Sequence, residues 1–215
     1  AVLKSRPDVV ILAGDLHEPP HSPEPFYNLL SQMSARVPVF YTEGNHDLRK
    51  RDSSQYNAHL EQISASGAAL LNDTVVPLQK GGDCVLLYGQ SWRGIKAKQT
   101  PVFDLDFPSI LVCHDPMQFD RLDPLPDLML SGHVHGGILR LPWIGPIFAP
   151  GDGTPVYKRF ARRFFFPKYS KGLYHKGAHT LAVTQGLGFS ILPIRFIPPE
   201  IMVLTLKSNK KTNNS

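Results

Sequence analysis

The sequence predicts an α/β fold in which short buried strands alternate with helices. Five short apolar or β-branched runs each end in glycine, histidine or a polar turn, at residues 9–14, 37–42, 84–89, 109–114 and 128–132. Helical spacing of apolar side chains appears between these runs, at residues 22–37 and 53–64. Such alternation is typical of parallel strands whose carboxyl ends meet at one edge, where chemistry is usually located.

The two helices are predicted from their first turns and their apolar faces. Ser22 can cap the first helix, and Pro23 suits its first turn. Its apolar positions are Phe26, Leu29, Leu30 and Met33, and those of the second helix are Tyr56, Leu60 and Ile63. From residue 142 onward glycine, proline and aromatic residues predict loops before a last strand at 201–207. One domain is therefore expected over residues 1–206, followed by a polar, disordered tail at 207–215.

The composition is that of one globular domain with a substantial core. The chain has 215 residues, of which 42% are hydrophobic and 19% charged. No apolar run approaches the roughly 18 residues that span a bilayer. The net charge of +5 suits an anionic partner, such as a phosphate, a nucleic acid or an anionic membrane face, and does not choose among them.

Four of the predicted strand ends carry side chains that can bind a metal. Taken singly, each is weak evidence, because a Gly-Asp turn or a histidine after a strand is common without a metal. Histidines at positions i and i+2 face the same side, as in Gly-His-Val-His. The candidates are Asp15, the group Asn45, His46 and Asp47, then His114, and the pair His133 and His135.

Taken together and in this order, these motifs resemble those of the calcineurin-like metallophosphoesterases. The resemblance extends over residues 7–206, and the closing segments 141–150, 169–177 and 184–200 are similar to a bacterial branch, the YaeI/YkuE-type phosphodiesterases. That branch includes enzymes that cleave the pyrophosphate of UDP-2,3-diacylglucosamine in lipid A synthesis. The resemblance implies a four-layer α/β/β/α sandwich with two divalent metal ions at the strand ends.

The stretch Gly-Asp-Leu-His at residues 14–17 fits two motifs of that family, Gly-Asp and Asp-x-His. If it were the Asp-x-His, a separate Gly-Asp should follow before Gly44, and none does. The resemblance therefore assigns Asp15 to the Gly-Asp motif. It places the Asp-x-His and its strand upstream, in a part of the protein that precedes this chain. His17 is then not expected to be a ligand, although it could touch the substrate.

The resemblance also implies a role for each remaining residue. Asp15 would bridge two metals, with Asn45, His114 and His133 completing one of them. His135 would bind the other metal together with the upstream motif. His46 would contact the phosphoryl group or protonate the leaving group, and Asp47 would orient the His46 ring. Mixed oxygen and imidazole ligands suit Mn²⁺, our first expectation, and also Fe or Zn²⁺.

Two other functions remain open at this point. A binding scaffold with an inactive site would typically have lost ligands, but every ligand position within this chain is filled. A nucleic-acid enzyme would suit the basic charge, but the sequence contains no evident recognition module, so no nucleic-acid partner is expected. The leading prediction is a dinuclear-metal phosphodiesterase or pyrophosphohydrolase.

The substrate class depends on loops that combine aromatic and basic residues, at 141–148, 159–169 and 188–199. These could pack on the core with their charges in solvent. They could instead form a surface that inserts aromatic rings among anionic lipid headgroups. The second interpretation predicts a lipid-linked substrate and a cytoplasmic location, peripheral on the inner face of the membrane, with an upstream anchor left open. A soluble phosphate ester is the alternative.

Overall fold

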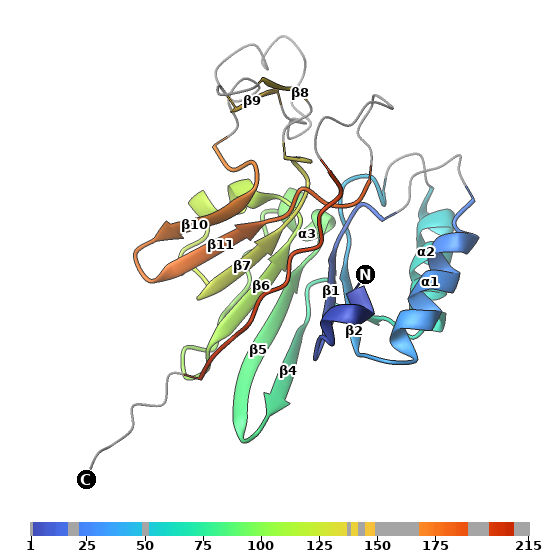
Figure 1. Cartoon of the computed structure of the whole chain (residues 1–215), viewed down its shortest axis with the longest axis horizontal. Coiled ribbons are helices and arrows are strands. Elements are labelled where there is room, and N and C mark those ends of the chain that lie inside the picture. The colour runs from blue at the N-terminus through green and yellow to red at the C-terminus, as the bar shows by residue number, and fades with distance from the viewer. Residues whose placement is uncertain are drawn as a thin grey trace.

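A computed structural model describes residues 2–16, 22–48, 52–136, 139–141, 145–148, 168–188 and 198–208. It confirms the α/β class, with two sheets packed face to face (Figure 1). The three-stranded parallel sheet has the order β1 (Val10–Ala13), β2 (Val39–Thr42) and β3 (Ala69–Leu70). The six-stranded sheet has the order β10 (Gly172–Lys176), β11 (His179–Val183), β7 (Leu128–Ser131), β6 (Ser109–Cys113), β5 (Asp83–Gln90) and β4 (Val75–Lys80).

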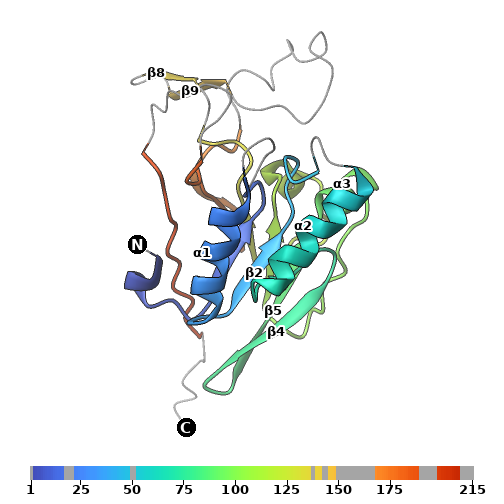
Figure 2. The same ribbon diagram turned by 90° about the vertical axis from the view of Figure 1, so that its right-hand side faces the viewer.

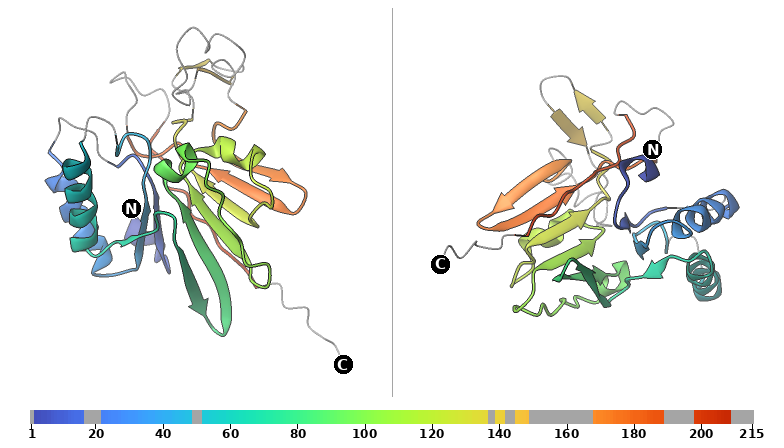
Figure 3. Two further views of the ribbon diagram at one scale, coloured as in Figure 1. Left: turned by 180° about the vertical axis from the view of Figure 1, so that it is seen from behind. Right: turned by 60° about the horizontal axis from the view of Figure 1, so that its bottom comes forward.

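Helices form the two outer layers. The long helices α1 (Glu24–Ser34) and α2 (Ser53–Ala65) cover the outer face of the three-stranded sheet (Figure 2). The 3₁₀ helix η2 (Pro116–Asp120) contacts β7 and β11 of the six-stranded sheet, the short helix α3 (Trp92–Lys96) contacts α2 through Arg93 and Tyr56, and the 3₁₀ helix η1 (Val2–Ser5) precedes β1. The views in Figure 3 place the three-stranded sheet between α1, α2 and the six-stranded sheet. The fourth layer is therefore much thinner than the first.

The helix starts differ in how they are capped. Asp52 caps α2 through a reciprocal capping box with Gln55. The expected cap of α1 was wrong: Pro23 occupies the cap position, with no side-chain capping bond, and Ser22 instead contacts the carboxylate of Glu24.

The core that the two sheets share lies between them. It contains the buried residues Phe40, Leu71, Leu87, Ile110 and Val112. Strand β1 alternates between two cores: its even positions pack under α1 and α2, and its odd positions face the six-stranded sheet. Because β1 is covered on both faces, its apolar run is continuous, which explains the run seen in the sequence.

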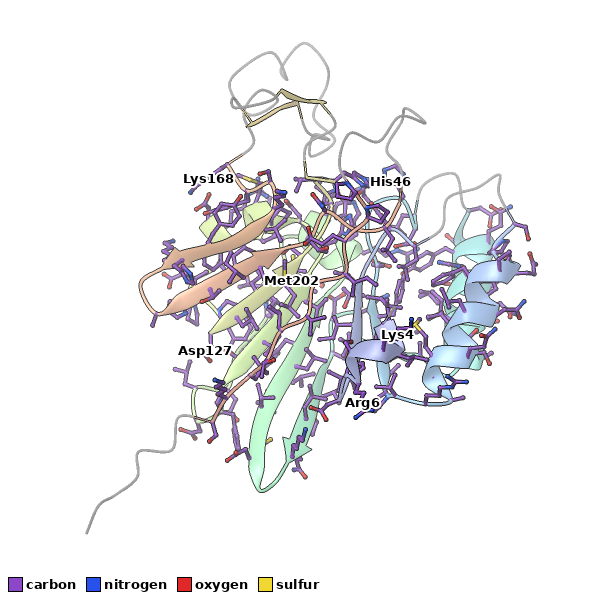
Figure 4. The ribbon with its side chains drawn as sticks, viewed as in Figure 1. Lys4, Arg6, His46, Asp127, Lys168 and Met202 are labelled. Carbon is purple, nitrogen blue, oxygen red and sulfur yellow. The ribbon has the colours of Figure 1, made fainter. Side chains whose placement is uncertain are left out.

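The strand ends that carry the candidate ligands meet at one end of the two sheets. Strands β5, β6 and β7 are mutually parallel, as are β1 and β2, so their carboxyl ends share an edge. Figure 4 shows His46 at this end and Asp127, which precedes β7, at the other.

Residues after 142 depart from the prediction of loops and a last strand. Strands β10 and β11 form an antiparallel hairpin, and a further hairpin joins β8 (Leu139–Leu141) to β9 (Gly145–Phe148). The predicted strand at 201–207 was wrong, because this segment pairs with no strand in the described part of the chain. Strand β4 was missed because it contains Pro77, which an edge strand tolerates.

Among the described residues, no helix combines the length and apolar character needed to cross a membrane.

The core between the sheets predicts a large effect of shortening Leu87. Leu87→Ala should lower the free energy of unfolding by about 2–5 kcal/mol, because it removes a fully buried side chain and leaves a cavity. The matched control is Leu105→Ala, at a side chain that is 82% exposed, where a change within about 0.5 kcal/mol is expected. Urea unfolding followed by circular dichroism measures both. Equal effects at the two positions would contradict the assignment of this core.

Candidate metal centre

Two glycines let the loops after β1 and β2 approach each other. Gly14 has a φ of 84°, and a Cβ there would lie 2.5 Å from the Gly44 nitrogen and 2.7 Å from Nδ1 of His114. A Cβ on Gly44 would collide with the carboxylate of Asp15. Both positions therefore require glycine. Their contact brings the end of β1 against the loop that carries Asn45 and His46.

The carboxylate of Asp15 connects three strand ends. Its Oδ1 accepts the backbone N–H of His46 at 2.7 Å, across from β2. Its Oδ2 lies 2.9 Å from Nε2 of His114, at the end of β6. The two groups form an ion pair when the His114 ring is protonated.

The ring of His114 has a defined tautomer. Its Nδ1 lies 2.5 Å from the carbonyl oxygen of Ala13, which can only accept, so Nδ1 carries a proton. In the neutral ring, Nε2 is then a lone pair that faces the carboxylate of Asp15. Two acceptors at 2.9 Å repel unless a proton or a cation lies between them. This is the orientation of a metal-binding histidine whose second nitrogen is held by the backbone.

The electrostatics of the pair fit the same interpretation. Burial alone would raise the pKa of Asp15, but the adjacent His114 outweighs it and holds that pKa well below its usual range. Burial alone would lower the pKa of His114, but the charge of Asp15 raises it above the ordinary value. Burial, aided by the charge of His114, lowers the pKa of His133 to about 4. His133 is therefore neutral near pH 7, as a ligand must be.

Four buried side-chain atoms that could bind a metal accept or donate no assigned hydrogen bond among the described residues, although two of them face each other as an ion pair. An unsatisfied buried polar atom costs about 1–3 kcal/mol, so such atoms gathered on neighbouring loops require an explanation. Asp15, His114 and His133 each place one ligand atom within 4.8 Å of the others. A divalent cation bound there would satisfy them, and the donor set fits such an ion. The four atoms are Asp15 Oδ2, Asn45 Oδ1, His114 Nε2 and His133 Nδ1.

Backbone strain is concentrated in the same residues. Asp15, His133 and His135 have φ angles of 56°, 68° and 51°, in the left-handed region that residues with a Cβ rarely adopt. Half of the six positive-φ non-glycine residues in the described part of the chain belong to this site. Such strain typically persists where it orients functional side chains.

A family model for calcineurin-like phosphoesterases matches residues 1–137, more than half of the chain. The chain belongs to the calcineurin-like phosphoesterase family. This phosphoesterase is accordingly a metal-dependent hydrolase, and the family and enzyme class predicted from the strand-end motifs are confirmed.

Two bacterial relatives are similar over almost the whole chain. The metallophosphoesterase YkuE of Bacillus subtilis (strain 168) is 30% identical over 219 residues, which cover 95% of this chain and 70% of YkuE. The phosphodiesterase YaeI of Escherichia coli (strain K12) is 29% identical over 212 residues, 95% of this chain and 72% of YaeI. A transmembrane protein with a metallophosphoesterase domain from Danio rerio is 26% identical over 222 residues, 94% of this chain and 46% of that protein.

The structure of this phosphoesterase brings some of the predicted residues together and leaves others apart. Asp15, His114 and His133 form the cluster, and Asn45 and His46 lie on the loop that touches it. His135 follows on the same turn as His133 but is not a member of that cluster. His17 lies outside the described residues.

Asp47 is fully buried behind the site. Its Oδ2 accepts the backbone N–H groups of Asp15 at 2.8 Å and Gly44 at 2.7 Å. Its Oδ1 lies 3.7 Å from Nε2 of the buried His59, whose Nδ1 contacts the Tyr27 hydroxyl at 2.7 Å. Asp47 therefore holds the two loops together, a role that the sequence did not indicate. The predicted orientation of the His46 ring by Asp47 stays a prediction.

Sequence analysis missed the wall of the site. Trp92, on α3, packs against the rings of His114 and His133, with centroid distances of 5.9 and 5.4 Å. It follows strand β5, so its place after a predicted strand end could have marked it as a candidate site residue. Its aromatic side chain was not considered because it is not a ligand. In the structure it shields the ligand rings from solvent on one side.

The cluster predicts that a divalent ion stabilises the folded chain. Excess Mn²⁺ should raise the melting temperature by roughly 5–10 °C, the shift expected when a ligand well above its Kd binds only the folded state. His114→Ala should remove most of this shift, since it deletes one of the converging donors. The measurement is differential scanning fluorimetry with and without Mn²⁺, supported by the metal content of the purified protein.

The matched control for this experiment is His175→Ala, on the exposed hairpin strand β10, where the ring contacts only Thr180 among the described residues. That variant should keep the full Mn²⁺ shift. A full shift in His114→Ala, or a lost shift in His175→Ala, would show that the ion binds elsewhere.

Proposed function

We propose that this phosphoesterase hydrolyses a phosphodiester or pyrophosphate bond, using two divalent metal ions, of which Mn²⁺ is the first candidate. The observation that carries the proposal is the convergence of unsatisfied buried donors at the strand ends. A salt bridge between Asp15 and His114 would leave the role of Asn45 unexplained. A metal site explains all four residues, because a hydrolase of this class needs oxygen and imidazole ligands around an ion.

The proposed division of labour follows the donor positions. Asp15 would bind both ions, and Asn45, His114 and His133 would complete the first site, where Nδ1–H of His114 is fixed by Ala13. His135 would belong to the second. When bound, such ions neutralise phosphoryl oxygens and lower the pKa of a coordinated water.

The reaction needs a proton at the leaving group. The oxygen of a water molecule forms a bond to phosphorus, and the bridging ester or anhydride oxygen departs with the electron pair of the broken bond. We assign the proton for that oxygen to His46, which is half-buried and whose backbone is tied to Asp15. Asp47 would act through the loop, by holding the backbone on both sides of Asn45 and His46.

These roles separate chemistry from metal binding. His46→Ala should lower kcat by roughly 10²–10⁴-fold, the usual contribution of a positioned acid, while the metal content stays unchanged. Asp15→Ala should lose metal and activity together, because one carboxylate serves both ions. Elemental analysis and steady-state kinetics of the full-length protein test both, on a phosphodiester whose leaving group is an alcohol and therefore needs a proton. Loss of the metals in His46→Ala would refute the assignment of His46 as the acid.

We also propose that the second ion depends on an Asp-x-His strand that precedes this chain. Strand β1 pairs only with β2 among the described residues, so its other edge could accept such a strand. The described donors account for one ion site, with His135 apart from it. The metal content in the Mn²⁺ experiment decides the matter: two tightly bound ions per 215-residue chain would contradict this proposal and restore His17 as a candidate ligand.

For the substrate, we propose a lipid-linked phosphate such as UDP-2,3-diacylglucosamine, met at an anionic membrane surface. The support comes from the sequence: Arg159, Arg162 and Arg163 precede three consecutive phenylalanines at 164–166, a stretch outside the described residues. Each basic residue near an anionic leaflet contributes about 1 kcal/mol of attraction, and interfacial aromatics add apolar burial. Relatives named as transmembrane proteins support a membrane setting.

The lipid proposal predicts a substrate-dependent defect. Changing Phe164, Phe165 and Phe166 together to serine should impair turnover of the acylated UDP-sugar and spare bis-p-nitrophenyl phosphate. Wild-type enzyme should co-sediment with anionic vesicles, and less so at high salt. Phe107→Ser, at an exposed phenylalanine in the described part of the chain, is the control and should change neither activity. Equal loss on both substrates would indicate a packed loop, and absent vesicle binding would favour a soluble substrate.

A further inference from the structure

Arg93 carries a positive charge that has no part in the proposed metal site or in the proposed role of His46. Its guanidinium carbon lies 3.7 Å from the centroid of the Tyr56 ring, so the group stacks on an aromatic face. The side chain is exposed, and within the described residues its guanidinium donates no hydrogen bond and forms no ion pair. A stacked guanidinium keeps its N–H donors in its own plane, so those of Arg93 are available to a ligand.

The backbone of Arg93 is held in place by several polar contacts. Its N–H donates to Oε1 of Glu43 at 2.9 Å. Ser91, which directly precedes Trp92, caps α3. The carboxylate of Asp73 accepts the backbone N–H of Ser91 at 3.0 Å and its hydroxyl at 2.5 Å. A Cβ at Gly94 would lie 2.5 Å from the same carboxylate of Asp73. The start of α3 is thus packed closely against Asp73 and bonded to it.

Glu43 links Arg93 to the loop that carries His46. It is fully buried, directly precedes Gly44, and its carboxylate also accepts the hydroxyl of Tyr56, the ring on which Arg93 stacks. A buried carboxylate is stable only when its oxygens are paired, and here both are. The same side chain therefore fixes the catalytic loop, the aromatic platform and the backbone of Arg93.

The preceding residue links Arg93 to the metal donors. Trp92 packs against the rings of His114 and His133, so α3 begins at the wall of the cluster. Figure 2 shows α3 at the upper end of α2, and Figure 4 places His46 at the same end of the sheets. Arg93 thus directly follows the residue that packs on the ligand rings, and its backbone is bonded to Glu43, which directly precedes the loop that carries His46.

We propose that Arg93 binds the phosphate that is not attacked, and so makes the enzyme favour pyrophosphate diesters over diesters of a single phosphate. This inference rests on the proposed function. The ligands at the strand ends serve the phosphoryl group under attack, and a second, linked phosphate carries a further negative charge. A planar guanidinium pre-oriented by stacking matches two phosphate oxygens at once. A purely structural Arg93 would instead contribute only the weak stacking of an exposed pair.

The test uses two substrates that differ only in the second phosphate, bis-p-nitrophenyl phosphate and P1,P2-bis-p-nitrophenyl pyrophosphate, followed by product analysis with Mn²⁺ present. Arg93→Met should lower kcat/KM for the pyrophosphate about 10- to 100-fold, mainly through KM, the effect expected of a lost hydrogen bond to a charged group. The change on the single-phosphate diester should stay below about threefold. Arg93→Lys should recover part of the loss, because it restores charge without the planar fork.

Lys96→Met is the matched control, because it removes another exposed cation from the same short helix, and it should keep the preference. Melting temperatures identify any variant that is misfolded. These kinetics use the full-length protein, which includes the proposed upstream strand, and wild-type protein of that length that cleaves neither substrate would refute the proposed function itself. Cleavage of both substrates with equal losses in Arg93→Met, or wild-type activity on the single-phosphate diester alone, would refute only the role of Arg93.

Discussion

The buried carboxylate of Asp47 is the contact on which the rest of the site depends. One oxygen accepts two backbone N–H groups, from Asp15 on one loop and Gly44 on the other. A fully buried carboxylate is costly without hydrogen-bond partners. Separating the two loops would remove these partners, so the buried charge of Asp47 holds the loops together. Their close approach in turn needs glycine at 14 and 44, and it brings the Asp15 side chain to the N–H of His46.

In that arrangement, a proton and a metal ion would compete for Nε2 of His114. Because the folded chain raises the pKa of His114, the protonated ring is the form that Asp15 stabilises when no ion is bound. A cation bound at Nε2 would have to displace that proton, so the proposed metal binding would weaken as pH falls through the raised pKa. His133 behaves oppositely: its pKa is lowered to about 4, and it offers a neutral ring over the whole neutral range. The two histidines thus differ in what they require before they can coordinate.

The sequence predicted the parts of this fold that depend on local pattern. The apolar runs at 9–14, 109–114 and 128–132 each end one residue beyond the strands that close at Ala13, Cys113 and Ser131, and the candidate ligands follow these strands at one edge of the sheets. The strand expected at 201–207 failed because an apolar, extended pattern does not specify a pairing partner. The hairpin β10–β11 was missed since its side chains are mostly exposed or half-buried, which weakens the apolar pattern.

The site shows the same limit at the level of single residues. Ligand types and their order can be recognised in a sequence, because an ion accepts only a few side chains. Supporting residues cannot, because Glu43, Tyr56 and Trp92 are common residues whose importance comes only from what they touch.

Asp47 illustrates this limit most clearly. Its place in an Asn-His-Asp motif predicts a partner for the neighbouring imidazole, and the structure adds that its carboxylate binds backbone N–H groups from two separate loops. Every residue except proline has a backbone N–H, so the sequence does not show which of these groups bind Asp47. The contacts by which Asp47 organises the site therefore cannot be read from its motif. The same reasoning applies to Arg93, whose contacts Glu43 and Tyr56 lie just after β2 and in α2, up to 50 positions away from it in the chain.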